Sequence, residues 1–257
     1  MTPWSPPIPA LIYGTILLAS ALAFLIFGGI ARLRSLFQPQ THTQSPSLNI
    51  APLAMLIGAS LLGLCAWLAN PLLPGTALAV GIVLTTLSGQ KPFILWGLYR
   101  PHPFRDFGFS LATMLTLFFP ILFLLLLSTG FYLALHLPFE PQPAMTRFLE
   151  ARDAKTLLPF LTYALIIAPI WEEIFFRGTL FPWLTSRFSI TQAQWISALA
   201  FGAVHLHGPT LIPLTLLGAA LAGVYRTKNS LVPSILLHSL FNANTCILLL
   251  LSRPPLP

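Results

Sequence analysis

Charged side chains are scarce in this chain: of its 257 residues, only 7% are Asp, Glu, Lys or Arg. So few charges exclude a soluble domain, because a water-exposed surface requires them. The rest of the composition agrees, since 56% of the residues are hydrophobic and the mean hydropathy is +0.81. We therefore expect an all-α membrane protein that folds as a polytopic transmembrane helical bundle.

Cysteine is also rare, with only Cys65 and Cys246, which lie far apart in apolar runs. This spacing predicts neither a disulfide framework nor a cysteine-based metal site. No signal peptide is expected either, because the first apolar run, residues 11–30, lacks a preceding basic region and a convincing cleavage site. The absence of an internal repeat counts against the inverted-repeat transporter folds.

Apolar runs of about 20 residues, the length that crosses a bilayer, predict about eight spans. We place them at residues 10–31, 51–69, 75–90, 108–136, 156–180, 190–206, 209–225 and 230–251. The first four form an N-terminal region, residues 1–155, and the last four form a core, residues 156–257, that carries the polar motifs described below.

The net charge of +7 would suggest nucleic acid as a partner in a soluble chain, but here the basic residues lie in short loops and form no basic cluster. Basic residues in such loops indicate how a membrane protein is oriented in the bilayer. We therefore expect membrane lipids and not nucleic acid as partners. If the N-terminus is outside the cytoplasm, nine of the 13 basic residues fall on the cytoplasmic side: Arg32, Arg34, Lys91, Arg100, Arg105, Arg177, Arg187, Arg226 and Lys228. The positive-inside rule thus favours both termini outside, and the lack of soluble sequence favours the bacterial inner (plasma) membrane.

Three ionisable residues interrupt the apolar run that ends at Ile170, and each costs roughly 2.5–3.5 kcal/mol at bilayer depth. Glu173 and Arg177 lie four residues apart, on one helix face, so they are expected to pair. Glu172 points about 100° away and has no local partner, which suits it to general acid/base chemistry. Alternatively, all three sit at a helix end and extend into the headgroups.

Two further polar sites lie in apolar helices downstream. Phe201 and His205 are four residues apart, as are His238 and Asn242, so the two residues of each pair share a helix face. Counting from the expected turns near 188–189 and 227–228 places Glu172, His205 and the second pair at comparable depth. Each histidine taken alone would more simply be a hydrogen-bonding residue between helices.

In this order, Glu172-Glu173-x-x-x-Arg177, Phe201-x-x-x-His205 and His238-x-x-x-Asn242 resemble the three motifs of a known family. It is the CAAX protease and bacteriocin-processing (CPBP, or Abi) family of intramembrane glutamic endopeptidases. The resemblance covers about residues 156–245. It implies that Glu172 and His205 activate a water, that His238 and Asn242 stabilise the oxyanion, and that Glu173 and Arg177 support them.

The resemblance implies a peptide or protein substrate with a membrane-associated or lipidated segment. No cofactor is expected, although Glu172, His205 and His238 would also suit zinc, because two histidines and a glutamate form a known type of zinc site. Two other functions stay open: a proton-coupled transporter that uses these residues as a relay, and a non-catalytic scaffold that keeps the motifs for packing.

Overall fold

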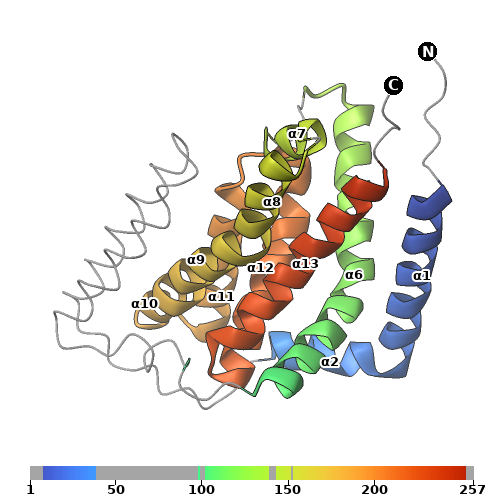
Figure 1. Ribbon diagram of the computed structural model, residues 1–257. Coiled ribbons are helices and arrows are strands. Elements are labelled where there is room, and N and C mark those ends of the chain that lie inside the picture. Colours follow the sequence, from blue (N-terminus) through green and yellow to red (C-terminus); the bar gives the residue numbers. More distant parts are fainter. Residues whose placement is uncertain (1–7, 39–97, 99–101, 139–142, 152, 253–257) are drawn as a thin grey trace.

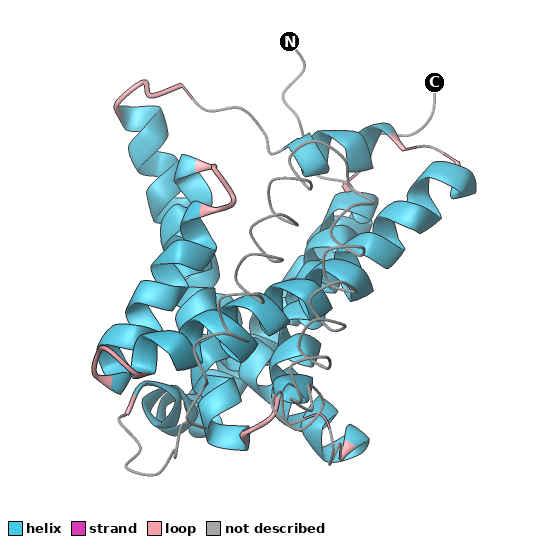
Figure 2. Ribbon diagram, turned by 90° about the vertical axis from the view of Figure 1, so that its left-hand side faces the viewer, coloured by secondary structure: helices cyan, strands magenta, loops and turns pink. Residues whose placement is uncertain are grey.

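The computed structural model describes residues 8–38, 98, 102–138, 143–151 and 153–252. The described residues are almost entirely helical and contain no strand (Figure 2), which confirms the all-α class. The helices are α1 (Ile8–Phe24), α2 (Ile30–Phe37), α6 (Pro103–Ala134), α7 (Pro143–Glu150), α8 (Ala154–Thr162), α9 (Ala168–Phe175), α10 (Phe181–Thr185), α11 (Ile190–Ala203), α12 (Gly208–Lys228) and α13 (Leu231–Leu251). Short π-helical segments join some of them: η1 (Leu25–Gly29), η2 (Tyr163–Ile167) and η3 (Phe176–Leu180).

Four of these helices are long and apolar enough to cross a membrane: α6, the continuous helix Ala154–Thr185, α12 and α13. They confirm the spans expected at 108–136, 156–180, 209–225 and 230–251. The expected total of about eight is higher than this number. The runs at 10–31 and 190–206 correspond to shorter helices, with an apolar segment Leu11–Ala23 in α1 and only 14 residues in α11. The spans expected at 51–69 and 75–90 lie outside the described residues.

The long helices form a bundle around α12 (Figure 1). In its most apolar segment, 56% of α12 is buried, against 33% or less for the other three spans. Outward faces carry large exposed apolar side chains, such as Phe123 and Leu126 of α6 at 57% and 64% exposure. Such surfaces are compatible with lipid, and they explain why so few charges suffice.

Small residues let α12 pack closely against its neighbours. A Cβ atom at Gly218 would lie 3.0 Å from Cα of Ala198 in α11, so the two backbones touch there. The small residues of α12 therefore allow close helix packing. At its end, α12 stops at Asn229, whose φ of 49° is left-handed, and the Ser230 side chain caps α13 by accepting from the backbone N–H of Val232.

The short helix α2 is held against α11 and α12 by polar contacts to its backbone. Gln194 Nε2 donates to the carbonyl oxygens of Leu36 (3.2 Å) and Ala219 (2.7 Å). Arg226 donates to Gln194 and, at 2.7 Å, to the carbonyl of Gln38 just after α2. The carbonyls of Leu36 and Gln38 lie at the end of α2, where no helical donor follows, so buried side chains supply their hydrogen bonds.

The approach of α2 to α12 also depends on Gly223, where a Cβ atom would lie only 2.5 Å from the Leu36 carbonyl oxygen. We expect Gly223→Ala to lower the free energy of unfolding by about 1–3 kcal/mol, because one of the two backbones must shift. Thermal unfolding of the purified protein in detergent measures this. Gly130→Ala in α6 is the matched control, since a Cβ there has no atom within 4 Å; equal melting temperatures for the two variants would contradict the prediction.

Candidate active site

The two acidic residues lie on α9, a short helix between two π-helical turns. In η2, the backbone N–H of Ala168 donates to Tyr163 O, and in η3 that of Phe181 donates to Phe176 O, five residues back in each case. A proline follows each donor, Pro169 and Pro182. A proline clashes with the carbonyl four residues before it, and a widened turn relieves that clash. The helix therefore stays continuous through both prolines, and α9 keeps its place in the bundle.

Asn242 of α13 contacts the first of these turns. The carbonyl of Ala164 loses its ordinary donor, because the N–H of Ala168 binds Tyr163 and the next candidate, Pro169, has no N–H. Asn242 Nδ2 donates to this carbonyl at 2.8 Å. Asn242 thus joins α13 to the helix that carries the acids, and one of its two amide hydrogens is used for that purpose.

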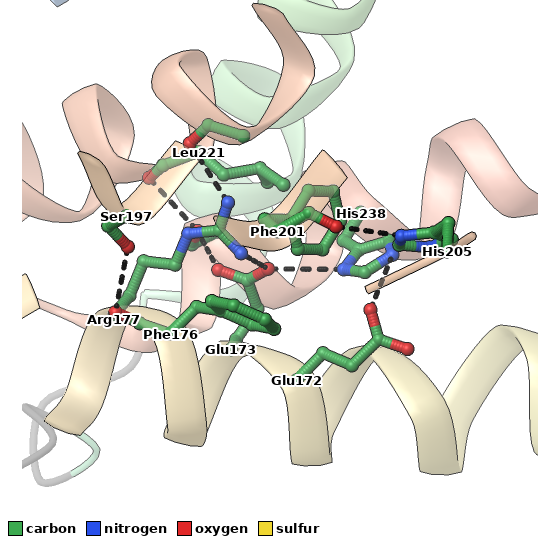
Figure 3. A network of polar contacts seen from close by, with 11 residues as sticks. Glu172, Glu173, Phe176, Arg177, Ser197, Phe201, His205, Leu221 and His238 are labelled. Carbon is green, nitrogen blue, oxygen red and sulfur yellow. Dashed lines mark hydrogen bonds and ion pairs between the residues drawn. The ribbon is translucent and has the colours of Figure 1, made fainter. Parts of the chain in front are cut away.

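Glu173 lies at the centre of a buried polar network, and its side chain is fully buried. Arg177 Nη1 donates to Oε1 at 2.7 Å, Ser234 Oγ donates to Oε2 at 2.6 Å, and His238 Nδ1 lies 3.1 Å from Oε1 (Figure 3). Because a carboxylate can only accept, His238 Nδ1 carries a hydrogen in this contact. The expected pair of Glu173 and Arg177 is confirmed, and Glu173 also orients His238.

Arg177 is likewise fully buried and carries the network to α12, where its Nη2 donates to Gly218 O at 2.9 Å. Its guanidinium carbon also lies 4.6 Å from the centre of the Phe201 ring. The alternative in which all three ionisable residues extend into the headgroups is therefore wrong for Glu173 and Arg177. For the same reason, Arg177 does not report topology, although the sequence count placed it among the cytoplasmic basic residues.

Glu172 is turned away from this network, as its helical position predicts. Its Oε2 atom lies 3.9 Å from His238 Nε2, which is too far for a hydrogen bond, and this buried oxygen has no hydrogen-bond partner. The side chain as a whole is 21% exposed. His238 therefore lies between two carboxylates, with one nitrogen bound to Glu173 and the other facing Glu172 (Figure 3).

His205 approaches the same region from the end of α11. It follows the last helical residue, Ala203, by two positions, so it lies in the turn and not within a helix as the sequence suggested. Its Nδ1 lies 2.8 Å from the carbonyl of Phe201, an acceptor, which places a hydrogen on Nδ1. In the neutral ring, Nε2 then carries a lone pair. The Phe201 ring packs against both imidazoles, with centroids 5.0 Å from His205 and 5.5 Å from His238.

A zinc ion does not fit these residues as they are arranged. Among the described residues, no three His, Cys, Asp or Glu side chains converge as metal ligands would. His238 in addition directs Nδ1 at Glu173, and its other nitrogen faces Glu172 without a third ligand nearby. The arrangement instead suits proton transfer, because a carboxylate with an unpartnered oxygen faces the oriented imidazole of His238.

The structure brings together five of the six candidate site residues named from the sequence: Glu172, Glu173, Arg177, His205 and His238. The sixth, Asn242, contacts a backbone carbonyl in η2. Sequence reasoning missed Ser234, although a signal was present, because Ser234 precedes His238 by four residues and so shares its helix face. It also missed the Gly218 carbonyl, which no side-chain pattern could indicate.

The fold and the site together define a multi-pass membrane protein in which Glu172 and Glu173 of α9 lie beside His238 of α13, with His205 in the turn after α11. Residues 154–244 match the family model described as Rce1-like, type II CAAX prenyl endopeptidase. This match confirms the resemblance drawn from the three motifs, so residues 154–244 are similar to the CAAX protease family. No curated protein and no solved structure gives a significant match.

Proposed function

We propose that this protein is an intramembrane glutamic endopeptidase that hydrolyses a peptide bond of a membrane-associated or lipidated substrate. The observation that carries the proposal is Glu172 Oε2, a buried carboxylate oxygen without a hydrogen-bond partner, 3.9 Å from His238 Nε2. Its neighbour Glu173 is already neutralised by Arg177. Glu172 is thus the acid in this site with an oxygen free to accept a proton from water.

In the proposed reaction, a water lies between Glu172 and the lone pair of His205 Nε2. Glu172 takes a proton from this water while the water oxygen attacks the carbonyl carbon of the substrate. A tetrahedral oxyanion forms. The C–N bond then breaks, and Glu172 returns the proton to the leaving amine. Water supplies both the hydroxyl of the new acid and one hydrogen of the new amine, so no further reactant is needed.

His238 is proposed to donate to the oxyanion from Nε2. Since its Nδ1 hydrogen is directed at Glu173, a second hydrogen on Nε2 makes the ring an imidazolium. In that state Glu172, Glu173, Arg177 and His238 carry two negative and two positive charges, so the buried site is neutral. The contact with Glu173 also fixes the ring orientation, so the donor is in place before the oxyanion forms.

Asn242 is proposed as the second oxyanion donor, a role that rests on the family resemblance. Its amide has one hydrogen left beyond the one given to Ala164 O. The contact with η2 would hold that hydrogen in a fixed direction. Glu173 and Arg177 are proposed as supporting residues that act through His238 and do not touch substrate.

We further propose the bacterial inner membrane as the location, with both termini outside the cytoplasm. The beginning of α1 and the end of α13 lie at the same end of the bundle (Figure 1), which supports termini on one side. The basic residues Arg32, Arg105 and Lys228 belong to α2, to the start of α6 and to the end of α12, at the other end. That end would face the cytoplasm under the positive-inside rule.

The activity can be tested with purified protein in liposomes. Three peptides are compared: one with a prenylated C-terminus, the same sequence without the prenyl group, and one with an apolar membrane-spanning segment. We expect cleavage at a single bond in at least one membrane-bound peptide, read by mass spectrometry, and unchanged cleavage with a chelator. Loss with chelator and recovery with zinc would show a metal enzyme, whereas proton flux across the liposomes without any cleavage would favour a transporter.

A further inference from the structure

Two basic side chains from distant parts of the chain lie against one aromatic ring at the end of the bundle that α2 occupies, and a third lies one helical turn before that ring. The guanidinium carbon of Arg32 in α2 lies 5.0 Å from the centre of the Phe109 ring, and Lys228 Nζ at the end of α12 lies 3.9 Å from it. Arg105 precedes Phe109 by one helical turn on the same face of α6. We call Arg32, Arg105 and Lys228 the basic triad.

In the part of the chain that the structure describes, one carboxylate, Asp106, lies close to this triad. Asp106 acts electrostatically on Lys228, together with Arg105 and Arg32. Its side chain is almost fully buried, and its Oδ2 also accepts from the backbone N–H of His102. Three positive charges against one negative charge leave two positive charges in excess.

No other acid among the described residues lies near the triad. Residues 1–105 contain no Asp or Glu, and Glu172 and Glu173 belong to the candidate active site. Glu150 and Asp153 flank α7 and α8 at the opposite end of α6 (Figure 1). Glu140 lies outside the described residues.

The triad also lies at the ends of membrane-spanning helices, at the level of the lipid headgroups. Arg105 is in the first turn of α6 and Lys228 is the last residue of α12, and both helices are long and apolar enough to cross the membrane. Side chains at such helix ends meet the lipid headgroups. Anionic headgroups attract each nearby Lys or Arg, and basic pockets between helix ends bind them.

We propose that the basic triad binds the headgroup phosphate of an anionic phospholipid. Phe109 holds two of the cations, Arg32 and Lys228, by cation–π contacts. Because these side chains are already held in place before the phosphate binds, less side-chain entropy is lost on binding. The three cations come from α2, α6 and α12, so the bound lipid joins α2 to the two spans. The site is separate from the candidate active site and does not depend on the proposed peptidase activity.

The proposal is tested by native mass spectrometry of the protein released from nanodiscs that contain equal amounts of phosphatidylglycerol and phosphatidylcholine. We expect retention of phosphatidylglycerol over phosphatidylcholine, and we expect Arg32→Gln/Lys228→Gln to reduce this preference roughly 25-fold, or about fivefold for each cation. The matched control is Arg187→Gln, because Arg187 is an exposed cation that also stacks on an aromatic ring, 4.2 Å from Trp183. The control should keep the wild-type preference.

Arg105→Gln is the second test variant, used if the double variant does not fold, because Arg105 is exposed. Its loss should reduce the preference for phosphatidylglycerol about fivefold. Equal retention of the two lipids by the wild type would overturn the proposal, as would an unchanged preference in both triad variants. Inorganic phosphate is added in a parallel series. Failure of millimolar phosphate to displace phosphatidylglycerol supports a lipid site, whereas displacement would assign the triad to a soluble anion and overturn it.

Discussion

Glu172→Gln is expected to abolish peptide cleavage while the protein still folds and inserts into membranes. The amide keeps the size of the side chain but cannot take a proton from water, and general-base catalysis contributes roughly 10²–10⁴-fold to a rate. The change should cost little stability, within about 1 kcal/mol, because Oε2 has no hydrogen-bond partner to lose. Cleavage rates in liposomes and thermal unfolding in detergent measure the two effects.

The matched control is Glu150→Gln, which removes the same charge from an exposed position at the end of α7. Its cleavage rate should equal that of the wild type. Retained cleavage in Glu172→Gln would remove the proposed base and with it the mechanism. Loss of folding in Glu172→Gln would contradict the interpretation of Glu172 Oε2 as an atom that makes no structural hydrogen bond.

The local part of the site could be predicted from the sequence, because it depends on helical periodicity alone. Four-residue spacing pairs Glu173 with Arg177 and turns Glu172 away, and both relations hold in the structure. The contact between His238 and Glu173 could not be predicted, because it depends on how α9 and α13 are rotated about their axes. A π-helical turn adds one residue and so rotates everything after it by about 100°, and no sequence pattern placed η2 or η3.

For the fold, too, features of one segment could be predicted from the sequence, whereas contacts between distant segments could not. Length and hydropathy identified the spans at α6, α12 and α13, but they also suggested a full span at residues 190–206, where α11 has only 14 residues. Composition showed no basic cluster, since Arg32, Arg105 and Lys228 are more than 70 residues apart from one another in sequence. They meet only because α2 and the ends of α6 and α12 occupy the same end of the bundle.

Arg177→Met is expected to have the largest effect on stability of any single substitution in the site. It leaves the fully buried carboxylate of Glu173 without its positive partner and the carbonyl of Gly218 without a donor. Removing one member of a buried ion pair typically costs about 3–5 kcal/mol. Cleavage should fall as well, because His238 then faces a Glu173 whose position and protonation are no longer fixed by the guanidinium. Unfolding in mixed micelles measures the stability.

A double-mutant cycle separates the ion pair from the loss of packing by the long arginine side chain. Adding Glu173→Gln to Arg177→Met removes the uncompensated charge, so the double variant should regain part of the lost stability and show coupling of at least about 1 kcal/mol. Arg187→Met is the control, since that arginine is exposed and should cost within about 0.5 kcal/mol. Equal stability of Arg177→Met and Arg187→Met would mean that Glu173 is held neutral by other means, and the proposed neutral site with an imidazolium at His238 would then have to be abandoned.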